Sequence, residues 1–180
     1  MKHAPDRTLR LFFALVPAAS VREAIAERGR DIATRAAGRA VPKANLHLTL
    51  AFLGNVSRAL APPLARILDE VPGTGFDLRL DRMGVFRQAR VAWIAPAIAP
   101  ESLALLERCL RSRLQETGFP PDARPFRPHV TLARHCATFV AEAACAPIGW
   151  RVDHVALVES RSAADGIRYR DLASRALEAR

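Results

Sequence analysis

Hydrophobic residues in the first third of the chain follow two different spacings, which predict a strand, a helix and a second strand. Residues 9–17 form a nearly continuous apolar run that stops at a proline, as a buried strand does. Apolar side chains then recur at helical spacing from a candidate N-cap at Ser20 to a stop at Gly38, which predicts an amphipathic helix. Residues 39–54 are typical of a turn followed by a strand that ends at Gly54.

The same order of elements returns in the second half of the chain. Residues 90–96 form another short apolar run closed by a proline, and leucines at helical spacing predict a helix over 100–118. Residues 119–134 then pass through several prolines into a strand. Each copy is followed by one more predicted strand, over 76–86 and over 152–160.

This repetition predicts an α+β fold built from a duplicated strand–helix–strand unit, with pseudo-repeats over about 9–86 and 90–160. A further helix over 57–70 links the halves if its two prolines occupy the first turn. The Gly- and Pro-bearing turn that follows is too short to separate independent domains. We therefore expect residues 1–180 to form a single bilobal domain whose halves could exchange strands.

Charge and cysteine content narrow the choice of partners. The chain has 27 Lys and Arg against 18 Asp and Glu, a formal net charge of +9, and only Lys2 and Lys43 are lysines. This charge favours an anionic partner, and arginine can bind phosphate through two parallel hydrogen bonds. The three cysteines, Cys109, Cys136 and Cys145, lack the spacing of a disulfide framework or a zinc finger.

The hydrophobic pattern gives no reason to expect a membrane partner. No apolar run approaches the roughly 20 residues of a membrane helix. The basic and apolar start of the chain lacks a small-residue cleavage site, so it is interpreted as a first strand rather than a signal peptide. We expect a cytoplasmic protein, and a monomer without an obligate protein partner is sufficient for the chemistry below.

Two His-x-Thr-Leu tetrads, at 47–50 and 129–132, occupy equivalent places in the two copies. On a strand, side chains alternate between the two faces, so each histidine shares a face with the threonine two residues later. The apolar residues between and after them point to the core. If a pseudo-twofold axis relates the halves, the polar faces meet at one groove and bring together the four polar side chains, His47, Thr49, His129 and Thr131.

Two imidazoles and two hydroxyls suit the opening of a phosphate ester. An imidazole can be neutral or protonated near pH 7, so one histidine can deprotonate a water while the other protonates the leaving sugar oxygen. The hydroxyls and nearby arginines can stabilise charge that develops on the non-bridging oxygens. This scheme requires no metal and no cofactor.

The other three histidines are expected to have no part in catalysis. His3 lies near the start of the chain, His154 suits a surface or sheet-pairing position, and His135 has no counterpart in the first half. A metal site built from His129, His135 and Cys136 is an alternative, although its spacing matches no familiar ligand pattern.

Four segments of the chain resemble the 2H phosphoesterase superfamily. They are LRLFFAL at 9–15, NLHLTLAFLG at 45–54, FRPHVTLAR at 126–134 and a late ES…G..Y..L pattern at 159–172. Within that superfamily they are most similar to the RNA 2′,3′-cyclic phosphodiesterases, also named 2′-5′ RNA ligases (the LigT/ThpR group). The resemblance implies a bilobal fold with two antiparallel sheets facing a central cleft. It also implies metal-independent hydrolysis of a terminal 2′,3′-cyclic phosphate to a 2′-phosphomonoester, and weak joining of RNA ends through a 2′-5′ bond.

The resemblance assigns roles to individual residues. It implies that His47 is the general acid and His129 the general base, and that Thr49 and Thr131 bind the substrate. Arg134, five residues after the second histidine, matches the family's phosphate-contacting arginine.

Two further residues are candidates for substrate binding. Phe52 matches a family aromatic beside the nucleobase, but on an unbroken strand it would face the core, and only a twist or bulge near Gly54 would turn it to the groove. Arg127 shares the face of His129, and could contact phosphate, if the second strand begins before Pro128.

We therefore expect an enzyme that hydrolyses RNA ends bearing a 2′,3′-cyclic phosphate. One alternative is an RNA-end-binding module that does not hydrolyse, but binding alone needs no paired imidazoles. Another is a 2H phosphodiesterase acting on small cyclic nucleotides, which the sequence does not separate from the first because the chemistry at phosphorus is the same.

Overall fold

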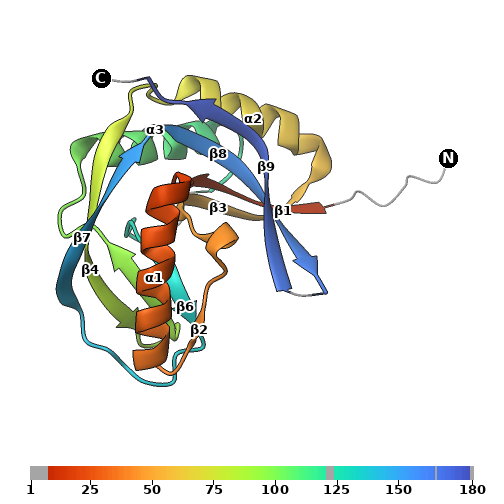
Figure 1. Ribbon diagram of the computed structural model, residues 1–180. Coiled ribbons are helices and arrows are strands. Elements are labelled where there is room, and N and C mark those ends of the chain that lie inside the picture. The colour runs from red at the N-terminus through yellow and green to blue at the C-terminus, as the bar shows by residue number, and fades with distance from the viewer. Residues whose placement is uncertain (1–7, 121–123, 165, 179–180) are drawn as a thin grey trace.

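A computed structural model describes residues 8–120, 124–164 and 166–178, so His3 lies outside the described residues. The described chain combines one large antiparallel sheet with helices, which confirms the predicted α+β fold (Figure 1). The strands are β1 (Thr8–Leu15), β2 (Arg39–Ala40), β3 (Leu48–Ser57), β4 (Phe76–Phe86), β5 (Val91–Ala95), β6 (Val130–Arg134), β7 (Ala143–Val152), β8 (His154–Ala163) and β9 (Gly166–Ala176). The helices are α1 (Ala19–Arg35), α2 (Ala61–Glu70) and α3 (Glu101–Glu116), with 3-10 turns η1 (Lys43–Asn45) and η2 (Arg58–Leu60).

The strand order is symmetric about the junction between the two halves. It runs β7-β4-β5-β6-β3-β1-β8-β9, with β2 paired to β6. β4 follows the first strand–helix–strand unit yet pairs with β5 of the second, while β8 follows the second unit and pairs with β1 of the first. The halves therefore exchange their outer strands. They meet where Leu48 of β3 pairs with Val130 of β6, which joins the two expected sheets into one.

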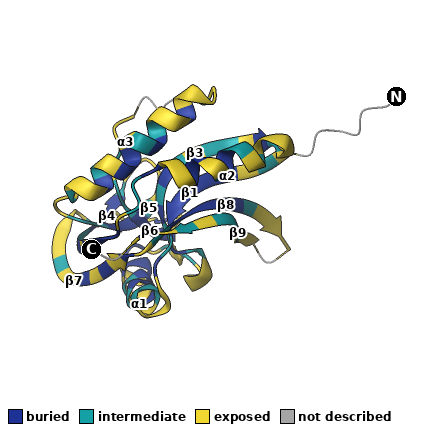
Figure 2. Ribbon diagram, turned by 90° about the horizontal axis from the view of Figure 1, so that it is seen from above, coloured by how far each residue is buried: buried dark blue, intermediate teal, exposed yellow. Residues whose placement is uncertain are grey.

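Helices α1 and α3 are exchanged in the same way. α1, from the first unit, packs on β6 and β7, while α2 and α3 lie over the other half, where α2 contacts β8 and β9 and α3 contacts β3. Gly29 allows α1 to approach β6 closely, because a Cβ at this position would lie 3.3 Å from the carbonyl oxygen of Leu132. Figure 2 shows that the helices expose their outer sides while the middle strands β1 and β8 are largely buried.

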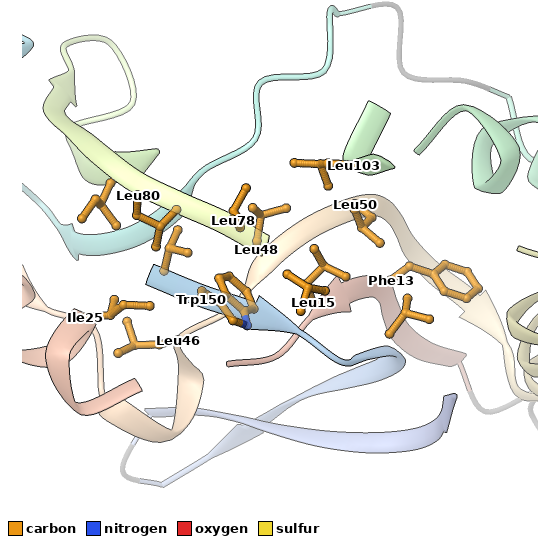
Figure 3. Close-up of a cluster of buried hydrophobic side chains, with 14 of the residues drawn as sticks. Phe13, Leu15, Ile25, Leu46, Leu48, Leu50, Leu78, Leu80, Leu103 and Trp150 are labelled. Carbon is orange, nitrogen blue, oxygen red and sulfur yellow. The ribbon is translucent and has the colours of Figure 1, made fainter. Parts of the chain in front are cut away.

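One hydrophobic core takes up the apolar side of the strand that carries the first tetrad. Leu46, Leu48 and Leu50 are buried and belong to the same core cluster as Ile25 of α1 and Trp150 of β7 (Figure 3). The same core contains Val130 and Leu132 of the second tetrad. The prediction that these apolar residues face inward is therefore confirmed. The opposite face of β3 and β6 is left for polar side chains.

Several predicted boundaries differ from the structure by a few residues. α1 begins at Ala19, and its N-cap residue is Ala18, which makes no side-chain capping bond, so the prediction of Ser20 as N-cap is wrong. Both prolines of α2 lie in its first turn, as expected. Cys109, Cys136 and Cys145 are free thiols. No helix within the described ranges is long and apolar enough to cross a membrane.

Candidate active site

Each catalytic candidate lies one residue before the strand that was expected to carry it. His47 precedes β3 and His129 precedes β6. The Nδ1 atom of His47 lies 2.8 Å from the carbonyl oxygen of Asn45, and that of His129 lies 2.7 Å from the carbonyl oxygen of Arg127. Because a carbonyl oxygen can only accept, Nδ1 carries the proton in both rings. In the neutral form each Nε2 is therefore the unprotonated, basic atom.

The pairing of Leu48 with Val130 places the two tetrads side by side on neighbouring antiparallel strands. Continuing this antiparallel register by one residue in each direction sets His47 across from Thr131 and Thr49 across from His129. Opposite residues on antiparallel strands share a face. Since Leu48 and Val130 point into the core, the four polar side chains lie on the other face. There, His47 Nε2 is 3.0 Å from the Oγ1 atom of Thr49.

Both tetrads also contain the same backbone irregularity. Between β1 and β3, Ala14 pairs with Thr49 and Phe13 with Ala51, so Leu50 is left without an opposite residue. Between β5 and β6, Trp93 pairs with Thr131 and Ala92 with Ala133, so Leu132 is left out in the same way. The fourth residue of each tetrad is thus the extra residue of a β-bulge, which resets the alternation of side chains along the strand.

These bulges determine which side chain reaches the groove five residues after each histidine. Phe52 pairs with Phe12, whose ring lies against His47, so Phe52 faces the groove with 57% of its surface exposed. Arg134 occupies the equivalent position after the bulge at Leu132 and is also exposed. The core position considered for Phe52 is therefore wrong. The bulge that turns it lies at Leu50, and a second irregularity, at Leu53, lies beside Gly54, where a bulge was expected.

Aromatic side chains pack against both imidazoles. The ring of His47 lies 4.8 Å from that of Phe12 and 5.0 Å from that of Tyr169, centroid to centroid, with Tyr169 edge-on. The ring of His129 meets Phe86 edge-on at 5.2 Å, and Phe86 in turn stacks on Trp93. These contacts hold the rings in place and remove water from around them.

Removal of water disfavours the charged imidazolium. Burial is the main cause that lowers the pKa of His47 to about 4. The hydrogen bond to the Asn45 carbonyl acts in the opposite direction and raises this pKa, whereas the charges of Arg134 and His129 lower it further. Burial also lowers the pKa of His129, with a smaller contribution in the same direction from Arg134. Arg134 thus acts electrostatically on both histidines. In the unliganded groove both rings are neutral near pH 7.

The sequence profile of the 2′-5′ RNA ligase superfamily matches residues 17–164. The chain belongs to this superfamily. The RNA 2′,3′-cyclic phosphodiesterase of Escherichia coli strain K12 is 39% identical over 131 residues, covering 73% of this chain and 74% of that protein. The protein of the same name from Thermus thermophilus is 35% identical over 144 residues, covering 72% of this chain and 70% of that protein.

Solved structures agree with this assignment. The crystal structure of E. coli LigT complexed with 3′-AMP has a TM-score of 0.86 and 35% identity, covering 95% of this chain and 99% of that one. A Thermus thermophilus structure has a TM-score of 0.81 and 28% identity, covering 94% and 98% of the two chains. The LigT-like fold implied by the resemblance is therefore confirmed.

The position of Arg127 in this superfamily member differs from the expectation. β6 begins at Val130, after Pro128, so strand alternation does not place the Arg127 side chain beside His129. The observed contribution of Arg127 is its backbone carbonyl, which orients the imidazole. Arg127 is otherwise an exposed residue.

The remaining ionisable candidates do not converge. In the described ranges, no group of three or more His, Cys, Asp or Glu side chains could hold a metal ion, so His129, His135 and Cys136 do not form the alternative metal site. His135 is exposed with a φ of 58°, whereas Cys136 is buried. His154 lies beside Asp153, 2.7 Å from its carboxylate, as expected for a surface position.

Sequence reasoning missed the residues that support the histidines from other strands. A cavity of about 360 Å³ lies beside His47, lined among others by Phe12, Asn45 and Tyr169. The Nδ2 atom of Asn45 donates to the carbonyl oxygen of Ile167 at 2.7 Å, which ties η1 to β9. Asn45 and Tyr169 fall within segments that carry the superfamily resemblance, but the packing of Phe12 has no local sequence signal.

Proposed function

We propose that this chain hydrolyses RNA ends bearing a 2′,3′-cyclic phosphate to 2′-phosphomonoesters. The observation that carries the proposal is the crossing of the two tetrads at Leu48 and Val130, which gives two oriented imidazoles and two hydroxyls on one face. Relatives named RNA 2′,3′-cyclic phosphodiesterase, up to 39% identical to this chain, support the same activity. E. coli LigT has been crystallised with 3′-AMP and with phosphate, ligands of the same chemical kind.

In the proposed reaction, Nε2 of His129 accepts a proton from a water, whose oxygen forms a bond to phosphorus. The bond from phosphorus to the 3′ oxygen breaks, and Nε2 of His47 gives that oxygen its proton. Both nitrogens are left without a proton in the neutral rings, because the Nδ1 atoms carry it in their hydrogen bonds to backbone carbonyls. The product carries its phosphate on the 2′ oxygen, and a proton passing between the two histidines through solvent restores the starting state.

Thr49, Thr131 and Arg134 would bind the non-bridging phosphate oxygens, where negative charge increases in the transition state. Phe52 would stack on the terminal base, which tolerates any base because every base has a π-face. Arg127 would contribute charge at the rim, in addition to its carbonyl. Ligation would be the same displacement with a 5′ hydroxyl in place of water: the 5′ oxygen bonds to phosphorus, the bond to the 3′ oxygen breaks, and the phosphate is left joining the 2′ and 5′ oxygens.

The lowered pKa values fit this scheme only when substrate is bound. A general acid must be protonated, yet burial keeps His47 neutral in the unliganded groove. The negative charge of the cyclic phosphate stabilises an imidazolium beside it and so raises the pKa. Substrate binding would therefore allow His47 to take up the proton that it later donates to the 3′ oxygen.

A single assay tests the proposal. An RNA oligonucleotide ending in a 2′,3′-cyclic phosphate is incubated in EDTA, and the product is identified as the 2′- or the 3′-monoester. We expect the 2′-monoester, and turnover that needs an added divalent ion would contradict the scheme. Binding without turnover would instead favour an RNA-end-binding module, and turnover confined to cyclic mononucleotides would favour a small-nucleotide phosphodiesterase.

The cytoplasm as the place of action and a monomeric state without an obligate partner belong to the same proposal. Every proposed catalytic group comes from one copy of the chain, so no second subunit is needed. Cell fractionation and light scattering of the purified protein would check these two expectations.

A further inference from the structure

The exposed ring of Phe52 is covered on one side by a charged group. The guanidinium carbon of Arg10, near the start of β1, lies 4.9 Å from the centre of the Phe52 ring. Arg10 is exposed, and within the described ranges it takes part in no ion pair. A guanidinium held on a ring face keeps its hydrogen-bond donors at the edge free for an anion.

The register of β1 places this pair in line with the catalytic groups. Ala14, Phe12 and Arg10 are alternate residues of β1, and they share the groove face since Phe12 contacts His47. Ala14 pairs with Thr49 and Phe12 pairs with Phe52. Alternate strand residues are about 7 Å apart. Moving along the groove away from the paired tetrads, the order of groups is thus the hydroxyl of Thr49, the ring of Phe52 and the guanidinium of Arg10.

We propose that Arg10 binds the phosphodiester that joins the terminal nucleotide to the rest of the RNA. This inference rests on the proposed function, because it takes the cyclic phosphate to lie at the tetrads. The order of groups in the groove then matches the order in the RNA, which is cyclic phosphate, terminal nucleoside, and internal phosphate. A cyclic mononucleotide has no internal phosphate, so Arg10 would make the enzyme select oligonucleotides.

On the opposite side of the sheet, the residues of β1 that follow Arg10 are buried. Leu11 and Phe13, the intervening residues of β1, belong to the main core, which also contains buried residues of α2. The groove face instead carries the small cluster formed by Phe12, Ala14 and their neighbours on β8, to which no helix contributes a described residue. We therefore place the RNA strand on the groove face.

Two substrates and two variants test the proposal. The substrates are adenosine 2′,3′-cyclic phosphate, which has a free 5′ hydroxyl, and the dinucleotide that ends in the same group. Arg10→Gln removes the charge and keeps much of the side chain. Arg66→Gln makes the same change on an exposed residue of α2, which covers the other side of the sheet.

We expect Arg10→Gln to lower kcat/KM for the dinucleotide roughly 5- to 10-fold, the loss of one exposed charge-assisted contact. The value for the mononucleotide should stay within about twofold, and the salt dependence of dinucleotide cleavage should become shallower by about one charge. Arg66→Gln should change neither. Equal losses on both substrates, or no loss on the dinucleotide, would overturn the role of Arg10.

Binding measurements separate this inference from the proposed function. The affinities of wild type and Arg10→Gln are measured for 2′-AMP and for the dinucleotide ending in a 2′-phosphate, without any turnover. A selective loss for the dinucleotide supports Arg10 even in a protein that hydrolyses neither cyclic substrate. An identical affinity of the two proteins for the dinucleotide refutes it even in an active enzyme.

Discussion

Leu48 of β3 pairs with Val130 of β6, and each is the residue directly after a histidine. This contact joins the two halves of the sheet, so it also sets how the two imidazoles lie relative to one another. Neither side chain touches solvent appreciably, since both are 0% exposed. The catalytic geometry is therefore set by hydrophobic packing beneath the polar residues, and it explains the expected effects of several substitutions.

Removal of either imidazole should abolish the reaction and leave the fold intact. We expect His47→Ala and His129→Ala each to lower kcat by roughly 10²- to 10⁴-fold on a cyclic-phosphate RNA. The double variant should lose little more than the worse single variant, because the two groups act as a unit. Circular dichroism provides the control for folding, and full activity in either single variant would refute the mechanism.

The two pH profiles of the enzyme should differ in a set direction. The profile of kcat/KM follows the free site, in which burial lowers the pKa of His47 and His129. The profile of kcat follows the complex, in which the phosphate anion raises these values. The alkaline limb, where the acid loses its proton, should therefore lie at higher pH in kcat than in kcat/KM. Coincident limbs would show that the phosphate does not lie beside the imidazoles.

Stability should depend on pH through His47. Its pKa is about 4 in the folded protein against the usual 6.5, so as pH falls the unfolded chain takes up this proton first. The stabilising contribution is thus complete above about pH 6.5 and is lost on acidification towards pH 4. Between about pH 7.5 and 5, wild type should lose about 2 kcal/mol more than His47→Gln, measured by urea unfolding. A parallel pH dependence in the two proteins would contradict the lowered pKa.

Phe52 should matter for binding and not for stability. Its ring is 57% exposed, so Phe52→Ala should change the free energy of unfolding by about 0.5 kcal/mol or less. The loss of base stacking should cost about 1–3 kcal/mol of binding, visible as a raised KM. Phe13→Ala, in the adjoining strand, is the matched control. Phe13 is 0% exposed, and its truncation should destabilise the fold by about 3–5 kcal/mol.

The lack of a side chain at Gly84 should be required for the packing of Trp93 and Phe86 against His129. A Cβ at this position would lie 2.9 Å from Cζ2 of Trp93 and 3.1 Å from the backbone of Glu142. Trp93 stacks on Phe86, whose ring edge meets His129. Gly84→Ala should therefore destabilise the fold by about 1–3 kcal/mol and lower kcat more than KM is raised. Gly149→Ala, where a Cβ meets nothing within 4 Å, is the control and should retain full activity.

Sequence periodicity was sufficient for the part of the site that obeys simple alternation. His47, Thr49 and the intervening leucine lie as period-two spacing predicts, and so do the equivalent residues of the second tetrad. The prediction fails beyond Leu50, because that residue is the extra one in a bulge. The position of this bulge depends on how β1 pairs with β3, and no local sequence pattern predicts that pairing.

The strands that escaped prediction are those at the edges of the sheet. β7 and β9 are each paired on one side, and most of their residues are exposed or half-buried, so neither shows a clean apolar run. Tyr169 reaches His47 from β9, and Phe86 reaches His129 from β4. Both contacts join segments far apart in the chain, so they required the three-dimensional structure.

The exchange of β4 and β8 between the halves has a consequence for folding. Each half borrows a strand and a helix from the other, so neither half contains all the segments that complete its own part of the sheet. Because partial unfolding of one half would remove a paired strand from the other, the molecule should unfold in one cooperative step. A chain cut in the exposed turn at 87–90 should accordingly yield two fragments that regain structure, and the catalytic groove, only when mixed.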